Sequence, residues 1–209
     1  MPNSHKNNTK KSGLKRTLLE WGGIAAVIAI LYVTGLHTVV LGTMQRALLW
    51  TGLFDAEGPE VTSTDGPMLS NADYQLQLTT PEGEQQMLQD FQGKVLFINV
   101  WASWCPPCVA EMPTIKTLYN EVSDNENIKF LLISLDEEPE KATHFMESRD
   151  FSMPYYFPTS GMPKVFHSPY IPSTYVVSKE GQIIYKQEGI ADFSSDSFRD
   201  WLVKQADGF

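Results

Sequence analysis

The chain has 209 residues, 42% of them hydrophobic, which is enough for the core of one ordinary domain with additional segments. Residues 1–20 hold five Lys or Arg side chains and one Glu, a net charge of +4, so the other residues hold −13 of the total of −9. Such an acidic body is repelled by nucleic acid, which excludes DNA and RNA as partners. Two cysteines are too few for a disulfide scaffold.

The segment 21–45, WGGIAAVIAILYVTGLHTVVLGTMQ, contains no formal charge and is long enough to cross a hydrocarbon core of about 30 Å as a helix. By the positive-inside rule, the cations before it place residues 1–20 in the cytoplasm and the body outside. The alternative is a cleavable signal peptide, which has a shorter apolar region and a small-x-small cleavage site. Because no convincing site follows Gly42, we predict a retained transmembrane anchor, a linker over 46–72 and a folded domain over 73–209.

The domain alternates between segments typical of strands and segments typical of helices. We expect strands at 74–78, 94–100, 128–135, 155–157, 173–178 and 182–188, with a further short strand or coil after a turn at 81–83. We expect one helical turn at 88–91 and helices from the cysteines to about residue 123, over 140–149, and after Ser194 and Ser195. This order predicts an α/β fold whose central strands are parallel.

The two cysteines directly follow the strand expected at 94–100, at a strand-to-helix turn where α/β folds place their chemistry. Pro106 is a natural first helical residue, so we expect Cys105 at the N-cap, exposed, with Cys108 one turn along and within bridging reach. A helix N-terminus and a CxxC motif both lower the pKa of a cysteine. We therefore expect Cys105 to be the nucleophile and Cys108 the more buried resolving thiol.

The two prolines between the cysteines indicate a direction for the electrons. An N-cap side chain normally accepts a hydrogen bond from the second or third helical N–H. These positions are Pro107, which has no N–H, and Cys108, and Pro106 at the first position also lacks an N–H. A Cys105 thiolate therefore loses local donors. This loss predicts a reducing pair rather than a strongly oxidising one.

Other uses of the cysteines remain open at this point. A structural zinc site needs four ligands at characteristic spacings, and a permanent disulfide here would close a ring too small to constrain the unfolded chain. A copper-binding module formed by Cys105, Cys108 and His167 is an alternative, because thiolates and imidazole suit that metal.

The stretch WASWCPPC after a buried strand resembles the active site of the thioredoxin superfamily. The longer run WCPPCVAEMP is similar to the TlpA/ResA-like branch of membrane-anchored thiol–disulfide oxidoreductases, and YIPSTY at 170–175 strengthens a resemblance that covers about 74–206. The resemblance implies a thioredoxin fold, with a central mixed sheet flanked by helices, that acts through its cysteine pair without a cofactor. It also implies a bacterial envelope location on the periplasmic side, a membrane thiol reductase as electron donor and oxidised client proteins, typically apocytochrome c.

The resemblance further assigns roles around the pair. Pro172 is expected in a cis peptide bond opposite the cysteines, although an X–Pro bond is cis in only about 5–6% of cases. The Ile171 backbone is then free to pair with an extended substrate segment. Trp104 is expected to line the substrate groove, with burial in the core as the alternative, and Trp101 is expected in the core. Pro113 is expected to interrupt and kink the helix.

Glu111 lies one helical turn after Cys108, and no Lys or Arg stands at 114 or 115 to pair with it. It is either a solvated side chain or, as the resemblance implies, a carboxylate close to the thiols. Thioredoxin itself uses a buried aspartate in the preceding strand as proton acceptor, and the matching position here is Asn99, which cannot titrate. We expect Glu111 to take the Cys108 proton when a mixed disulfide resolves.

A peroxidase of the peroxiredoxin kind has a related fold and is the rival enzyme class. Its peroxidatic cysteine normally lies near Thr and Arg, and residues 102–104, Ala-Ser-Trp, lack both. Thiol–disulfide exchange is therefore the function that the sequence favours.

Overall fold

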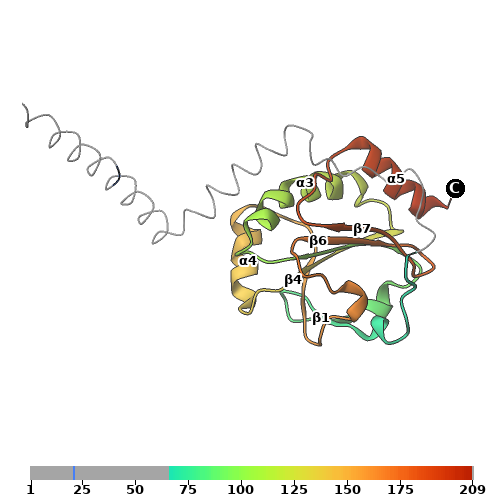
Figure 1. The fold of residues 1–209 in the computed structure, drawn as a ribbon, viewed down its shortest axis with the longest axis horizontal. Helices are drawn as coiled ribbons and strands as arrows, with labels where there is room; N and C mark the ends of the chain where they lie inside the picture. The colour runs from blue at the N-terminus through green and yellow to red at the C-terminus, as the bar shows by residue number, and fades with distance from the viewer. Residues whose placement is uncertain (1–20, 22–65, 209) are drawn as a thin grey trace, which may run out of the picture. The chain divides into compact units, whose positions relative to one another are not determined.

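The computed structural model describes Trp21 and residues 66–208 (Figure 1). The expected basic tail, the anchor after Trp21 and the linker up to residue 65 lie outside the described residues. Within the described part, no helix is both long enough and apolar enough to cross a membrane.

A seven-stranded sheet forms the centre of the domain (Figure 1). Its strands are β1 (Gln77–Thr79), β2 (Gln85–Met87), β3 (Val95–Trp101), β4 (Ile128–Ser134), β5 (Tyr155–Pro158), β6 (Ser173–Val177) and β7 (Ile183–Glu188). The spatial order is β2-β1-β5-β4-β3-β6-β7, with β3, β4 and β5 mutually parallel and every other neighbouring pair antiparallel. The sheet is thus mixed with a parallel centre, as predicted. The strand expected at 74–78 begins later, because its first residues form a 3-10 turn.

The described helices are α3 (Pro106–Val122), α4 (Pro139–Ser148) and α5 (Asp196–Asp207), with 3-10 turns η1 (Asp73–Gln75), η2 (Leu88–Phe91) and η3 (Lys164–Phe166). Ser195 caps α5, as predicted, by accepting a hydrogen bond from the Phe198 N–H at 3.4 Å. The predicted interruption at Pro113 is wrong, because α3 runs through that residue without a break. A proline removes the N–H of its own position only, so the rest of the helical ladder persists around it.

The two faces of the sheet belong to two separate cores, because successive side chains of a strand point to opposite faces. From β3, Phe97 and Trp101 join the core under α3, α4 and α5, whereas Ile98 joins the core that covers the opposite face. Asn99 belongs to the helix-facing row and is the polar member of an otherwise apolar strand. The sequence thereby places one amide beneath the N-terminal half of α3.

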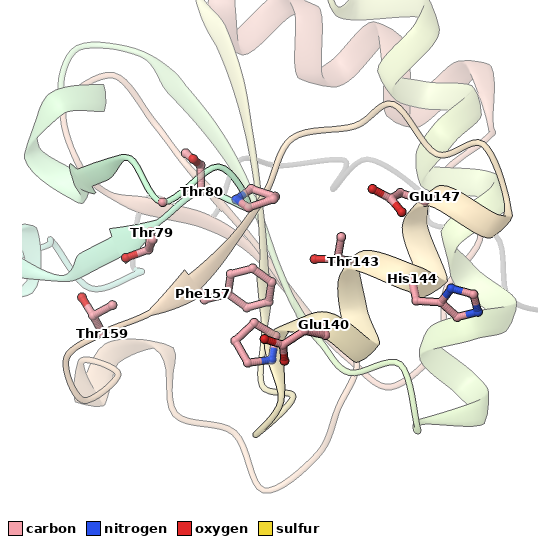
Figure 2. Close-up of a pocket in the computed structure, with 11 residues that line it drawn as sticks. Thr79, Thr80, Glu140, Thr143, His144, Glu147, Phe157 and Thr159 are labelled. Carbon is pink, nitrogen blue, oxygen red and sulfur yellow. The ribbon is translucent and has the colours of Figure 1, made fainter.

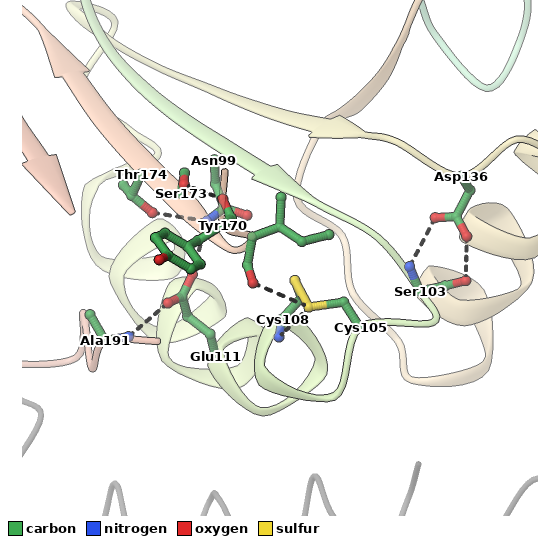
Figure 3. Close-up of a disulfide and its surroundings, with 11 residues drawn as sticks. Asn99, Ser103, Cys105, Cys108, Glu111, Asp136, Tyr170, Ser173, Thr174 and Ala191 are labelled. Atoms are coloured by element: carbon green, nitrogen blue, oxygen red, sulfur yellow. Dashed lines mark hydrogen bonds between the residues drawn. A yellow bond between two sulfur atoms is a disulfide. The ribbon is translucent and has the colours of Figure 1, made fainter. Parts of the chain in front are cut away.

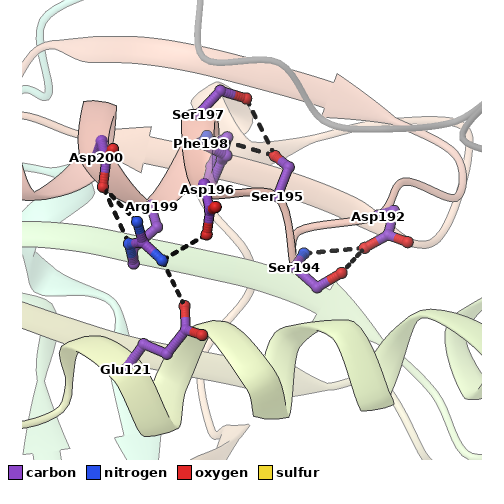
Figure 4. A network of polar contacts seen from close by, with 9 residues as sticks. All are labelled: Glu121, Asp192, Ser194, Ser195, Asp196, Ser197, Phe198, Arg199 and Asp200. Carbon is purple, nitrogen blue, oxygen red and sulfur yellow. Dashed lines mark hydrogen bonds and ion pairs between the residues drawn. The ribbon is translucent and has the colours of Figure 1, made fainter.

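Helices α3 and α5 lie side by side over this face, and a charged cluster joins them at the surface (Figure 4). Arg199 contacts Glu121 of α3 at 3.5 Å and Asp196 and Asp200 of its own helix at 2.6 and 2.8 Å. Ion pairs at a protein surface contribute little to stability. The buried side chains of α5, chiefly Phe198, therefore fix its position.

Candidate active site

The cysteine pair lies where β3 ends and α3 begins, as predicted (Figure 3). Cys105 is the N-cap of α3 and forms a disulfide with Cys108, with their Cα atoms 5.3 Å apart. The Cys108 N–H donates to the Cys105 Sγ at 3.3 Å. This is the third helical N–H, so one local donor to Cys105 persists beside the two prolines that have none.

The burial of the pair differs from the sequence expectation at Cys105. Its exposed fraction is only 4%, against 1% for Cys108, so the prediction of an exposed nucleophile is wrong for this oxidised state. The reason is that the Cys105 Sγ lies 3.7 Å from the carbonyl oxygen of Ile171, and both cysteines pack into the helix-side core. Cys108 is the more buried of the two, as predicted.

The segment opposite the disulfide contains the Ile171–Pro172 peptide bond, which is cis. The Pro172 carbonyl accepts from the Gly189 N–H at 2.9 Å, and the Ser173 hydroxyl donates to the Tyr170 carbonyl at 2.7 Å. Among the hydrogen bonds of the described residues, none engages the Ile171 N–H. The cis peptide bond before Pro172 thus agrees with the expectation from the resemblance.

Two exposed aromatic side chains stand next to site residues in the sequence, because Trp104 directly precedes Cys105 and Tyr170 directly precedes Ile171. Trp104 is 59% exposed, which rules out its burial in the core, whereas Trp101 is fully buried. Tyr170 is also exposed and, with Ile171 and His167, lines a small pocket of about 140 Å³. A larger pocket of about 510 Å³ lies between α4 and the β1–β5 pair, and its lining includes no residue of the cysteine site (Figure 2).

Glu111 is buried, with an exposed fraction of 1%, so its interpretation as a solvated side chain is wrong. Its Oε1 accepts from the Asn99 Nδ2 at 2.9 Å and its Oε2 accepts from the Ala191 N–H at 2.8 Å (Figure 3). Burial raises the pKa of Glu111 to about 8; the bonds from Ala191 and Asn99 oppose this shift and nearby Asp192 adds to it. Glu111 therefore exchanges a proton close to neutral pH.

Asp136 is a site residue that sequence reasoning missed. Its carboxylate accepts hydrogen bonds from the Ser103 N–H at 2.9 Å and the Ser103 hydroxyl at 2.6 Å (Figure 3). It also accepts one from the Ser134 hydroxyl at 2.8 Å. These bonds, with the Leu135 N–H that donates to the Trp101 carbonyl at 2.8 Å, hold the loop that leads into Cys105. The sequence contained a signal for this role, namely an acidic residue just after a predicted strand. Asp136 follows β4, which is parallel to β3, and the carboxyl ends of parallel strands lie at the same edge of the sheet.

Within the described residues, the groups that a copper site or a peroxidase needs are not assembled around the cysteine pair. His167 directs its Nε2 to the Met162 carbonyl oxygen at 2.8 Å, and within the described residues no group of three or more His, Cys, Asp or Glu side chains could hold a metal ion. Of the arginines in the described part, Arg149 stacks on the Phe145 ring and Arg199 belongs to the α5 cluster. Neither arginine forms a hydrogen bond with the Cys105 Sγ, whose partners among the described residues are the Ile171 carbonyl and the Cys108 N–H.

A family model described as Redoxin matches residues 56–197 of the chain. The chain belongs to the Redoxin family. The thiol-disulfide oxidoreductase ResA of Bacillus thuringiensis subsp. konkukian is 28% identical over 128 residues, which are 61% of this chain and 72% of that protein. The thioredoxin-like protein YneN of Bacillus subtilis is 32% identical over 107 residues, which are 51% of this chain and 63% of that protein.

A crystal structure of a putative thiol:disulfide interchange protein DsbE from Chlorobium tepidum shares the fold with a TM-score of 0.55. It is 17% identical and covers 73% of this chain and 99% of its own. This likeness shows the fold, and the two relatives confirm the prediction of a ResA/TlpA-like member of the thioredoxin superfamily and of a thiol–disulfide oxidoreductase.

Proposed function

We propose that the chain reduces disulfides in client proteins outside the cytoplasm, with Cys105 as the nucleophile and Cys108 as the resolving thiol. The observation that carries this proposal is the Cys105–Cys108 disulfide at the N-terminus of α3, which faces the carbonyl of Ile171 before the cis Pro172. The Ile171 N–H has no hydrogen-bond partner among the described residues, which supports the addition of an extended client segment as a strand.

The reducing reaction proceeds in two exchanges. The Cys105 thiolate attacks a client disulfide, which forms a Cys105–client mixed disulfide and releases the first client thiolate. Glu111 then takes the proton of Cys108, directly or through one water molecule, and the Cys108 thiolate attacks the Cys105 Sγ. The second client thiolate leaves, so the client has gained two electrons and the pair has become the disulfide of this structure.

The raised pKa of Glu111 suits the return step. In the oxidised protein the carboxyl retains its proton up to a pH of about 8. When an electron donor attacks Cys105, Cys108 leaves as a thiolate, and protonated Glu111 can return the proton to it. Glu111 therefore serves as base while clients are reduced and as acid while the pair is re-reduced.

The source of the electrons follows from the proposed location. With residues 21–45 as a membrane anchor and the positive tail in the cytoplasm, the domain works on the periplasmic side. A membrane thiol reductase is then the proposed donor, and oxidised apocytochrome c is the proposed client. Trp104 and Ile171 form the surface that contacts the client.

Trapping tests the assignment of the two cysteines. In the full chain, Cys108→Ser leaves Cys105 free to attack but removes the resolving thiol, so a disulfide-bonded peptide should remain attached to Cys105. The matched control replaces both cysteines by serine and should retain nothing. Equal retention by the trap and the control would contradict the proposal, and the clients retained from envelope extracts identify the substrate.

A redox titration tests the direction. We expect an equilibrium potential closer to the value of about −270 mV for thioredoxin than to about −120 mV for the oxidant DsbA. A potential near the DsbA value would instead make the protein a donor of disulfides. No observation in the described residues favours a peroxidase or a copper-binding module as a second candidate.

A further inference from the structure

Asn99 is the polar residue of β3 that reaches Glu111. Its Nδ2 donates to Glu111 Oε1 and to the hydroxyl oxygen of Thr174, each at 2.9 Å (Figure 3). Its Oδ1 is buried and has no hydrogen-bond partner among the described residues. A buried acceptor without a donor is costly, so this arrangement of the amide leaves one group unsatisfied.

In this arrangement both groups that bond to Glu111 are donors, which is what an ionised carboxylate needs. A carboxylate is purely an acceptor, and it receives donors from Asn99 Nδ2 and from the Ala191 N–H. A carboxylic acid carries an O–H that itself needs an acceptor. The Ala191 N–H cannot accept, whereas the unpartnered Oδ1 of Asn99 can do so once the amide has turned over.

Thr174 accommodates both arrangements. Its hydroxyl accepts from Nδ2 in the present orientation, and it can rotate to donate to Oδ1 in the other. Asn99 and Thr174 are also register partners on β3 and β6, so neither side chain has to move along its strand. Thr174 lies two residues after the cis Pro172. Its bond to Asn99 therefore links the Asn99 side chain to the strand that begins after the proposed client-binding residue Ile171.

We propose that Asn99 is a positioning residue whose side-chain amide turns over when Glu111 takes up the proton of Cys108. This proposal rests on the proposed function and deepens it. With the carboxylate, Nδ2 faces Glu111; with the acid, Oδ1 accepts the Glu111 O–H and orients it. The proton removed from Cys108 is then held in a defined direction until the pair is re-reduced.

Other ionisable groups near Glu111 could also make the Asn99 signals depend on pH, so the experiment needs controls for them. Asp192, on the loop before α5, and Tyr185, on β7, both interact electrostatically with it, and the cysteines lie on its own helix. The remaining neighbours that bond to it, Asn99 and the Ala191 backbone, do not titrate. Any response of Asn99 to pH must therefore be separated from the electrostatic influence of Asp192 and Tyr185.

The direct experiment records the side-chain amide signals of Asn99 by ¹⁵N NMR in the oxidised full chain, solubilised in detergent, between pH 6 and 10. We expect these signals to shift together with the carboxyl ¹³C signal of Glu111. In Glu111→Gln, in which position 111 cannot titrate, the Asn99 signals should not change with pH. Signals that stay constant in the wild type, or that also shift in Glu111→Gln, would overturn the proposal.

A kinetic experiment tests whether Asn99 affects the rate at which the disulfide is reduced. Asn99→Leu removes the acceptor for the Glu111 O–H, so dithiothreitol should reduce the disulfide several-fold more slowly than in the wild type, with circular dichroism to verify the fold. An unchanged rate would overturn the proposal. If Glu111→Gln slows reduction while the Asn99 signals stay constant in the wild type, the positioning role fails and the proposed function stands.

Discussion

Two carboxyl groups lie on opposite sides of the same disulfide, and their surroundings differ (Figure 3). Glu111 on α3 is buried under the helix with two donors, one from a side chain and one from the backbone. Asp136, after β4, accepts three hydrogen bonds, two from Ser103 and one from Ser134, and keeps 8% of its surface exposed. Burial raises the pKa of Glu111 to about 8.

The difference shows that the surroundings of a carboxyl group determine its role. Full burial with few donors makes the charge of Glu111 expensive, which suits a group that has to gain and lose a proton. The donors of Asp136 come from the loop before Cys105, so its bonds fix the position of that loop. We interpret Glu111 as the proton partner and Asp136 as the residue that holds the nucleophile in place.

The largest expected effect concerns stability and pH at Glu111. The pKa of this carboxyl is about 8 in the folded protein, against an ordinary value of 4.5. The folded state therefore binds the additional proton between these values, and stability falls as pH rises through this window, by up to about 1.4 kcal/mol per pH unit. Urea unfolding of the oxidised protein between pH 5 and 8 should show a loss of a few kcal/mol relative to Glu111→Gln. If the stability of the two proteins changed with pH in the same way, the raised pKa of Glu111 would be contradicted.

A smaller effect is expected at Asp136. The substitution Asp136→Ala leaves the Ser103 N–H and two hydroxyls without their acceptor, and each unsatisfied buried group costs about 1–3 kcal/mol. We expect about 2 kcal/mol of lost stability at pH 7, because partial exposure lets water replace some bonds. Asp136→Asn, which keeps one acceptor oxygen, should lose less. Equal stability of Asp136→Ala and the wild type would show that the loop does not depend on this residue.

The smallest effect is expected for Ser103→Ala, which removes the hydroxyl bond to Asp136 and keeps the backbone bond. One net hydrogen bond corresponds to about 1 kcal/mol, measurable by urea unfolding. The comparison also predicts that this variant retains the pH dependence set by Glu111, because the two carboxyls share no partner. A changed pH profile would show that the two sides of the disulfide are coupled.

Local patterns of the sequence predicted the parts of the site that depend on neighbouring residues. The apolar run before Cys105 predicted β3, and Pro106 predicted the helix start that places Cys105 at the N-cap. The predicted exposure of Cys105 failed because a segment 66 residues further along the chain covers its sulfur. No local pattern contains that contact.

The carboxyl groups illustrate the same limit. The burial of Glu111 depends on Asn99 and on the backbone of Ala191, which is 80 residues away in the sequence. The contact of Asp136 with Ser103 required the parallel register of β3 and β4. The sequence signal for Asp136 is an acidic residue directly after a buried strand. Because Glu137 and Glu138 follow it, the sequence alone does not distinguish Asp136 from its acidic neighbours.

The most direct test of Glu111 as proton partner is the rate at which dithiothreitol reduces the Cys105–Cys108 disulfide, compared between wild type and Glu111→Gln from pH 6 to 10. The ratio of the two rates cancels the titration of the reductant itself. Because only the acid form of Glu111 can protonate the departing Cys108, we predict a wild-type advantage below pH 8 that declines through about pH 8. A ratio that is constant across this range would contradict the account.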